Sequence, residues 1–197
     1  TGGASGSSAK YVYISELELA DGAVVEGGGY GLIATVGTGD TATADITAVG
    51  DVTLKTVTLS GKSWKVAGKL TVDGPTLYMN EQSTMGSLEV KAGSEVSYDT
   101  PSTATVSNST PILLNGDSAN GRALAFYPQC TAGMYSCTAT APTTYTLSGA
   151  VTATVPTKVF LAKDVTLNLT GAVTGEIVKT ADSQGILNIG GTTVGDE

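Results

Sequence analysis

Apolar and polar residues alternate along most of the chain, and this period of two is typical of β-strands. Val52 and Leu54, followed by Val57 and Leu59, show the alternation clearly. Gly or Pro recurs every few residues and would break a helix longer than two turns. The pattern therefore predicts an all-β fold.

One strand–break–strand unit recurs five times. In LEVKAGSEV, residues 88–96, the apolar residues are Leu88, Val90 and Val96, and the break falls at Gly93. The other copies begin at residues 17, 70, 159 and 187; the third of these has Asp164 at the break, and the copies at 70 and 187 are one residue shorter. The unit predicts that its apolar residues point inward: Leu17, Leu19, Val25, Leu70, Val72, Leu77, Leu88, Val90, Val96, Val159, Leu161, Leu167, Leu187, Ile189 and Val194.

Two all-β architectures explain such units. In a β-solenoid (a parallel β-helix), each copy is a strand, a corner and the next strand of a coil, and its inward residues stack on those of neighbouring coils. In a β-sandwich or jelly roll, residues 87–98 form a hairpin that turns at Ala92-Gly93. The recurrence favours the solenoid, although the copies have no constant period and loops of variable length must fill the gaps.

The chain divides into an arm and one domain. Residues 1–9 (TGGASGSSA) predict a flexible Gly/Ser-rich N-terminal arm, and residues 10–197 a single all-β domain. Residues 115–145 interrupt the strand pattern and hold both cysteines and Arg122, the one arginine. We interpret them as a loop excursion that makes specific contacts, or equally as a lid that only covers the core.

Residues 171–194 carry a resemblance. Gly175, Ile177, Lys179-Thr180, Gly185 and the run Leu187–Val194 look like the autotransporter-associated β-strand repeat of bacterial surface passengers. The family pattern usually has Gly where this chain has Ala181 or Asp182. The match covers about an eighth of the chain, and it implies a right-handed parallel β-helix displayed at a cell surface. No catalytic residue is implied, because the repeat has none.

Composition limits the partners. The net charge is −8, and only 14% of the residues are charged, which argues against nucleic acid or an anionic membrane surface as a partner. No apolar run approaches the ~20 residues needed to span a bilayer. The start at Thr1 without Met suggests that a leader has been removed.

The two cysteines, Cys130 and Cys137, enclose TAGMYS. Their spacing favours a local disulfide over two free thiols, and a disulfide predicts an extracellular or cell-surface location. With no histidine and no second cysteine pair, the sequence predicts no zinc site.

No active site is recognisable. Histidine-dependent nucleophilic catalysis is excluded. Glu16 and Glu18 share a strand face, and Glu89 and Glu95 lie in a similar unit, so that carboxylate pairs remain. We interpret all four as the solvated face of strands, and we predict no catalytic residue, no metal and no cofactor.

Two features suggest surface roles. Asn108-Ser-Thr and Asn168-Leu-Thr are glycosylation sequons, and Asn168 alternates with Leu167 and Leu169, so it should face solvent. Residues 10–19 form an alternating strand that serves either its own core or a neighbouring subunit. The candidate intersubunit residues are Tyr11, Val12, Tyr13, Ile14, Leu17 and Leu19.

The sequence therefore predicts a non-enzymatic extracellular structural protein, a subunit of a self-assembling, pilus-like cell-surface filament that polymerises with copies of itself by N-terminal strand donation. The alternative is a monomeric surface adhesin that binds a host glycan or protein through residues 115–145.

Overall fold

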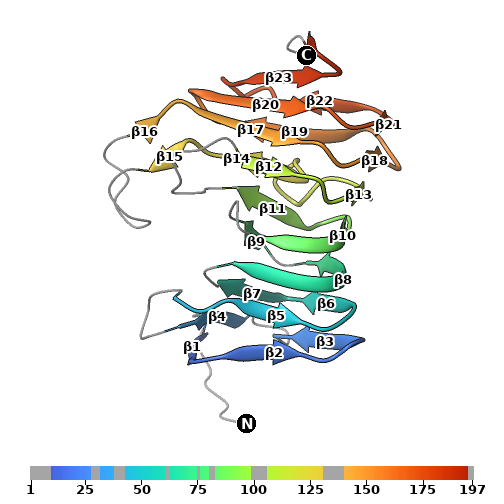
Figure 1. The fold of residues 1–197 in the computed structure, drawn as a ribbon. Helices are drawn as coiled ribbons and strands as arrows, with labels where there is room; N and C mark the ends of the chain where they lie inside the picture. Colours follow the sequence, from blue (N-terminus) through green and yellow to red (C-terminus); the bar gives the residue numbers. More distant parts are fainter. Residues whose placement is uncertain are drawn as a thin grey trace.

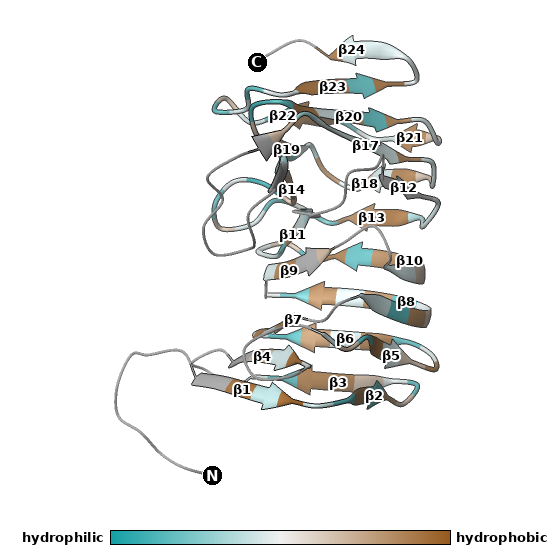
Figure 2. Ribbon diagram, turned by 60° about the vertical axis from the view of Figure 1, so that its left-hand side comes forward, coloured by the Kyte–Doolittle hydropathy of each residue, from teal (hydrophilic) through white to brown (hydrophobic). Residues whose placement is uncertain are grey.

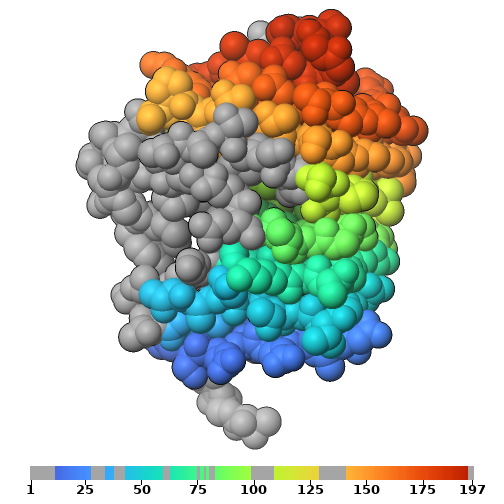
Figure 3. Space-filling model, viewed as in Figure 1, coloured from blue at the N-terminus to red at the C-terminus, as the bar shows by residue number. Residues whose placement is uncertain are grey.

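The computed structural model describes residues 10–27, 32–37, 43–60, 63–74, 76–79, 83–98, 106–130 and 140–194. These residues form an all-β structure of 24 strands, mostly in parallel sheets, without a helix. The strands lie one above another in chain order, from blue to red (Figure 1), and the same order runs along the surface (Figure 3). In this part of the chain there is no helix long and apolar enough to cross a membrane.

The largest sheet has nine strands, all paired in parallel. They are β2 (Leu17–Leu19), β3 (Ala23–Glu26), β5 (Ile46–Ala48), β6 (Val52–Lys55), β8 (Trp64–Asp73), β10 (Thr84–Val90), β13 (Ile112–Leu114), β18 (Val151–Ala153) and β21 (Val173–Thr174). The long strand β8 pairs with β5 through its first residues and with β6 through its last ones.

Three further sheets continue the stack. The first consists of β1 (Lys10–Ile14), β4 (Leu32–Val36) and β7 (Val57–Ser60). The second consists of β9 (Thr76–Met79), β11 (Glu95–Tyr98), β14 (Leu124–Phe126), β19 (Thr157–Leu161) and β22 (Ile177–Lys179). The third consists of β12 (Val106–Asn108), β17 (Thr143–Leu147), β20 (Val165–Leu169), β23 (Ile186–Ile189) and β24 (Thr192–Val194).

Antiparallel pairing is confined, among the described strands, to two places. One is β23 with β24, and the other is the separate ribbon of β15 (Gln129–Cys130) and β16 (Thr140–Ala141). The hairpin expected in a sandwich at residues 87–98 is wrong, because β10 and β11 pair with different partners and belong to different sheets.

A column of backbone corners runs through the stack. A Cβ atom added at Gly86 would lie 2.9 Å from the carbonyl oxygen of Gly68, and one added at Gly171 would lie 2.3 Å from that of Gly149. Thr110 continues the column, because its hydroxyl donates to the carbonyl of Met85 at 3.2 Å. Only glycine allows so close an approach between successive backbones.

This column separates a first row of strands from a second row, and a third row completes the stack. The first row precedes each corner and comprises β2, β5, the starts of β8 and β10, then β12, β17, β20 and β23. The second row follows the corner and comprises β3, β6, the ends of β8 and β10, then β13, β18 and β21. The third row comprises β1, β4, β7, β9, β11, β14, β19 and β22, with β7 and β9 in contact.

The predicted inward residues are confirmed. Eleven of the fifteen are buried, from Leu19 at 8% exposure to Leu187 at 0%. The remaining four, Leu17, Val25, Ile189 and Val194, are partly buried and pack against the same core. Leu17, Val25 and Val194 lie in the end strands β2, β3 and β24, each of which has one described partner strand, and Ile189 lies beside β24 in β23.

The break residue of each sequence unit has a positive φ angle. The angle is 85° at Gly93 and 65° at Asp164, so the aspartate adopts the left-handed conformation that glycine has in the other copies. The copies lie at different corners: those at 70 and 88 both join the second row to the third, but the copy at 159 joins the third row to the first. This placement explains why their starting positions show no constant period.

The loop excursion predicted at residues 115–145 overlaps two strands of the main sheets, β14 and the start of β17. Strand β14 is buried within the third row, and Tyr145 in β17 is fully buried. Between β14 and β17, the described residues outside the main sheets are 127–130 and 140–142, which include the β15–β16 ribbon. The sequence did not indicate β14, because a strand that is buried on both faces lacks the alternation of apolar and polar residues, and polar residues lie around the small Ala123 and Ala125.

Three rings fill the middle of the core. Tyr98 and Phe126 stack with their ring centroids 4.6 Å apart, and Tyr145 meets Phe126 edge-on at 5.1 Å. The Tyr145 hydroxyl donates to the carbonyl of Tyr127 at 2.6 Å, whereas the buried Tyr98 hydroxyl has no hydrogen-bond partner in the described part of the chain. Desolvation raises the pKa of Tyr98 above its ordinary value of 10.0.

Candidate functional site

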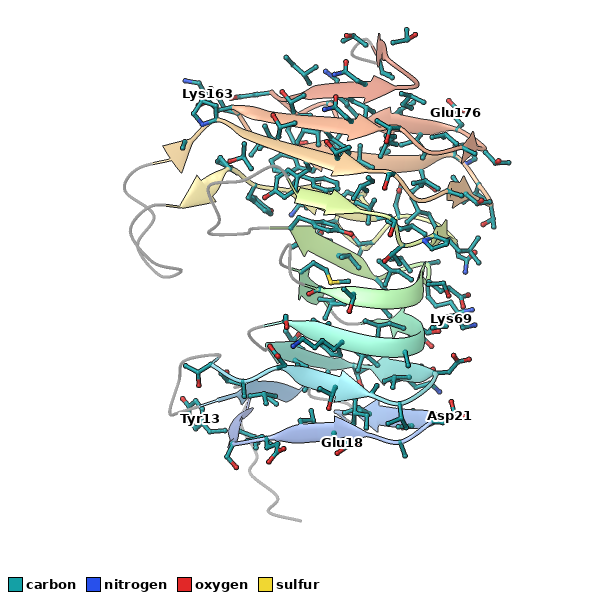
Figure 4. All side chains as sticks on the ribbon, viewed as in Figure 1. Tyr13, Glu18, Asp21, Lys69, Lys163 and Glu176 are labelled. Carbon is teal, nitrogen blue, oxygen red and sulfur yellow. The ribbon has the colours of Figure 1, made fainter. Side chains whose placement is uncertain are left out.

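Glu89 is a buried carboxylate on the outer face of the nine-stranded sheet. Its exposure is 8%, and it accepts from Lys91 Nζ at 2.6 Å, Lys69 Nζ at 3.1 Å and Asn115 Nδ2 at 2.8 Å. Lys69 lies in β8, Lys91 follows β10 and Asn115 follows β13, so the donors come from three neighbouring strands. Lys69 is labelled in Figure 4. The hydrogen bond from Lys91, helped by the one from Lys69, outweighs desolvation and lowers the pKa of Glu89 below 4.5.

Glu95 is a second buried carboxylate, on the outer face of the third row. Arg122 Nε donates to it at 2.8 Å, and Ser97 Oγ donates at 2.9 Å. The guanidinium carbon of Arg122 also lies 4.7 Å from the ring centroid of Phe160, and its Nη2 donates to the Tyr127 hydroxyl at 3.1 Å. The hydrogen bond to Glu95 raises the pKa of Arg122.

The sequence interpretation of these carboxylates is half right. Glu16 and Glu18 are exposed, as expected, but Glu89 and Glu95 are buried in ion-pair networks. Lys69, Asn115 and Arg122 lie about 20–27 residues away in sequence from the glutamates that they contact. These ion pairs and hydrogen bonds can be predicted from the sequence only when the pairing register of the strands is known.

Both clusters are networks of ion pairs and hydrogen bonds. A glycosidase acid needs a raised pKa, whereas the pKa of Glu89 is lowered. A pocket of about 200 Å³ beside Glu89 is lined by Lys69, Pro111, Leu113 and Thr152. It is smaller than typical ligand pockets of ~300–1,000 Å³. Within the described ranges, no group of three carboxylate, cysteine or histidine side chains is placed to hold a metal ion.

The N-terminal end of the stack leaves part of its core uncovered by the described residues. Val12 shares the inward face of the third row with Ala34 directly beside it, yet Val12 is 41% exposed and Ala34 is fully buried. Leu17 and Val25, inward residues of the next two strands, are also only partly buried. The outer edges of β1, β2 and β3 have no described partner strand.

The C-terminal end is covered in its first row only. Strand β24 folds back on β23 and the inward Leu187 is 0% exposed, but the outer edges of β21 and β22 have no described partner strand. Ile177 is 5% exposed, whereas Ile189 is only partly buried. The end strands also differ in hydropathy: β3 at the N-terminal end is strongly apolar, whereas β24 at the C-terminal end, with two threonines, is not (Figure 2). Tyr13, Glu18 and Asp21 mark the N-terminal end in Figure 4, and Glu176 lies near the C-terminal end.

The candidate intersubunit residues belong to strands paired within their own chain. Tyr11, Val12, Tyr13 and Ile14 lie in β1 beside β4, while Leu17 and Leu19 lie in β2 beside β5. They are therefore the first described strands of their own stack, and their outer edges have no described partner strand. Contact with a neighbouring chain stays a prediction, in the form of addition at these edges rather than transfer of the whole strand.

The remaining predicted sites are placed in part. Cys130 ends β15, but its side chain and all of Cys137 lie outside the described residues, as does the side chain of Asn108 in β12. Asn168 faces outward and is half-buried beside Asn188 of the neighbouring strand, whose Nδ2 donates to the Oδ1 of Asn168 at 2.8 Å. The disulfide and the glycosylation of both asparagines remain predictions.

Comparison of the chain with protein-family models, with curated proteins and with solved structures found no match.

Proposed function

We propose that the chain is a β-solenoid with three strands per turn, which works as a non-enzymatic extracellular structural subunit and assembles end to end into a cell-surface filament. Parallel pairing between strands one turn apart supports the solenoid, because every turn presents the same three rows to the next. A structure of this kind can continue across a junction between two copies.

The observation that carries the proposal is the open N-terminal end. Its three strand edges can accept hydrogen bonds from another chain, and its exposed Val12, with the partly buried Leu17 and Val25, offers apolar surface. Residues 1–9 contain no side chain larger than threonine, so their sequence provides little apolar material to cover such a surface. A second copy of the chain provides both strand edges and apolar side chains.

Size-exclusion chromatography with light scattering and electron microscopy of residues 1–197 tests the proposal. We expect filaments or a concentration-dependent ladder of oligomers for the natural chain. Val12→Asp should give monomers, because a carboxylate would be buried in the junction. The matched control is Val155→Asp, at a position 47% exposed in a corner remote from the open end; this variant should still assemble. A natural chain that stays monomeric at all concentrations refutes the proposal.

A second candidate function rests on the β15–β16 ribbon. It pairs only with itself among the described strands and lies outside the four stacked sheets. We propose it as the contact region of an adhesin for a surface glycan or host protein, now reduced to residues 127–142. Deletion of residues 129–141 should abolish binding to host cells without changing assembly; undiminished binding would exclude this function.

A further inference from the structure

The two ends of the stack are incomplete in complementary ways. At the N-terminal end, β1 is a third-row strand, and the described residues provide no first-row or second-row strand before it. At the C-terminal end, β23 is a first-row strand, and no third-row strand follows it among the residues that the structure describes. A β1 strand placed beside β22 of another copy would supply the missing third-row strand. This inference rests on the proposed end-to-end assembly and names its junction.

The free edge of β1 is defined by its backbone groups. The carbonyl of Ile14 accepts from Gly37 N at 2.7 Å, so the backbone of Ile14 points toward β4. The amide and carbonyl of one residue point to the same side of a strand, and the side alternates with each residue. The amides and carbonyls of Tyr11 and Tyr13 therefore point to the free edge.

The free edge of β22 follows from the same reasoning. Thr157 N donates to the carbonyl of Glu176 at 3.0 Å, and Thr180 N donates to the carbonyl of Val159 at 2.9 Å, so Glu176 and Thr180 face β19. The alternation leaves the backbone groups of Ile177 and Lys179 facing outward from the stack.

These groups select a register. In a parallel ladder, a residue bonds to the two neighbours of its partner. Tyr13 can therefore bond to Ile177 and Lys179 only when Val178 is its partner. The same register places Val12 beside Ile177 on the inward face, which continues the core, and it leaves the side chains of Tyr13 and Val178 adjacent on the outer face. We propose that β1 of one copy pairs in parallel with β22 of the next, with Tyr13 opposite Val178.

This junction requires β24 to move. The next copy's β2 would lie in the first row directly after β23, and β24 occupies that place in the single chain. The strand is joined through Gly190-Gly191, both with positive φ and open space around them. Thr192 and Thr193 are exposed, and the second row beyond β21 is vacant among the described residues. β24 is thus a removable cap that prevents elongation until it leaves β23.

A reversible lock tests the cap. Asn188 and Thr193 lie directly opposite each other in the antiparallel pair of β23 and β24, one pair away from Ile189 and Thr192, which flank the turn. The double variant Asn188→Cys/Thr193→Cys can therefore form a disulfide between the two strands. We expect the oxidised double variant to lose elongation completely and the reduced one to regain it. Each single variant under the same two conditions controls for the natural cysteines. Elongation of the oxidised double variant at the natural rate would overturn the cap.

A cross-link tests the register. Tyr13→Cys/Val178→Cys should give covalent oligomers on oxidation of assembled material, because the two side chains lie side by side across the junction. Val24→Cys/Val178→Cys is the matched control, since Val24 lies at the same end but in the second row, and it should give none. If filaments form without the first cross-link, this junction is wrong while the proposed function stands; if the natural chain forms no filaments, the proposed function itself fails.

Discussion

The first turn and a central turn of the stack contain the same sequence pattern with different outcomes. Leu17-Glu18-Leu19 and Leu88-Glu89-Val90 share their apolar and acidic positions. In the first turn, Leu17 is only partly buried and Glu18 is exposed. In the central turn, Leu88 is 1% exposed and Glu89 is 8% exposed. Burial here follows the neighbouring strands, because β2 has one described partner, β5, whereas β10 lies between β8 and β13.

The difference teaches what a repeat unit contains. Its own residues determine the direction of each side chain and the position of the corner, and both agree between the two turns. The environment of each side chain comes from neighbours 18 or more residues away, such as the partners Ile46 and Trp64 in successive turns. The environment of a side chain at an end of the stack therefore differs from that in the middle, even where the sequences match.

The largest expected effect separates these turns by stability. Leu88→Ala should lower the free energy of unfolding by about 2–5 kcal/mol, because the side chain is enclosed on all sides. Leu17→Ala should cost about 1 kcal/mol or less in the monomer, since part of its surface already meets solvent. Urea denaturation of both variants at low protein concentration measures the difference, and equal costs would show that the first turn is as well covered as the centre.

The paired carboxylates give the next effect, of about 1–2 kcal/mol. Glu89→Gln should destabilise the fold at neutral pH, because charged hydrogen bonds are lost. The side chains of Lys69 and Lys91 are 45% and 42% exposed, and solvent screening of both charges reduces the expected loss of stability. Glu18→Gln should change nothing measurable.

The pH dependence of this effect has a definite sign. The pKa of Glu89 is lower in the folded chain than its ordinary 4.5, so its stabilisation is present above that pH and is lost as the pH falls below it, through the folded value. The difference between the natural chain and Glu89→Gln should therefore shrink below pH 4.5. Thermal unfolding at a series of pH values measures this, and a difference that does not change with pH would contradict the assignment.

Sequence reasoning reached the residues whose roles are local. The alternation around Leu70 and Val72 and the breaks at Gly93 and Asp164 predicted inward faces and corners, because strand period and left-handed φ are properties of a few adjacent residues. It failed where the role depends on a distant partner. The ion pair of Glu95 with Arg122 bridges 27 residues, and no local pattern specifies that register.

The corners should behave alike in both turns. Gly22 has a φ of 73° and Gly93 one of 85°, and a Cβ atom at either position would meet open space. Only backbone strain opposes alanine there, so Gly22→Ala and Gly93→Ala should each cost about 1–2 kcal/mol. Chemical denaturation of the two variants checks this prediction. A cost that is much greater at Gly93 would mean that even the corners depend on neighbouring turns.

The smallest effect concerns two hydroxyl groups in the central turns. The Tyr145 hydroxyl donates a 2.6 Å hydrogen bond to the carbonyl of Tyr127, so Tyr145→Phe should lower the free energy of unfolding by about 1 kcal/mol. The Tyr98 hydroxyl is buried without a hydrogen-bond partner among the described residues, so Tyr98→Phe should be neutral or slightly stabilising, since it removes an unpaired polar group. Both rings keep their contacts with Phe126, stacked for Tyr98 and edge-on for Tyr145, which makes each variant the control for the other. Urea denaturation of both variants measures the difference. If Tyr98→Phe proved the more destabilised variant, the Tyr98 hydroxyl, and not that of Tyr145, would make the stabilising hydrogen bond in the centre of the stack.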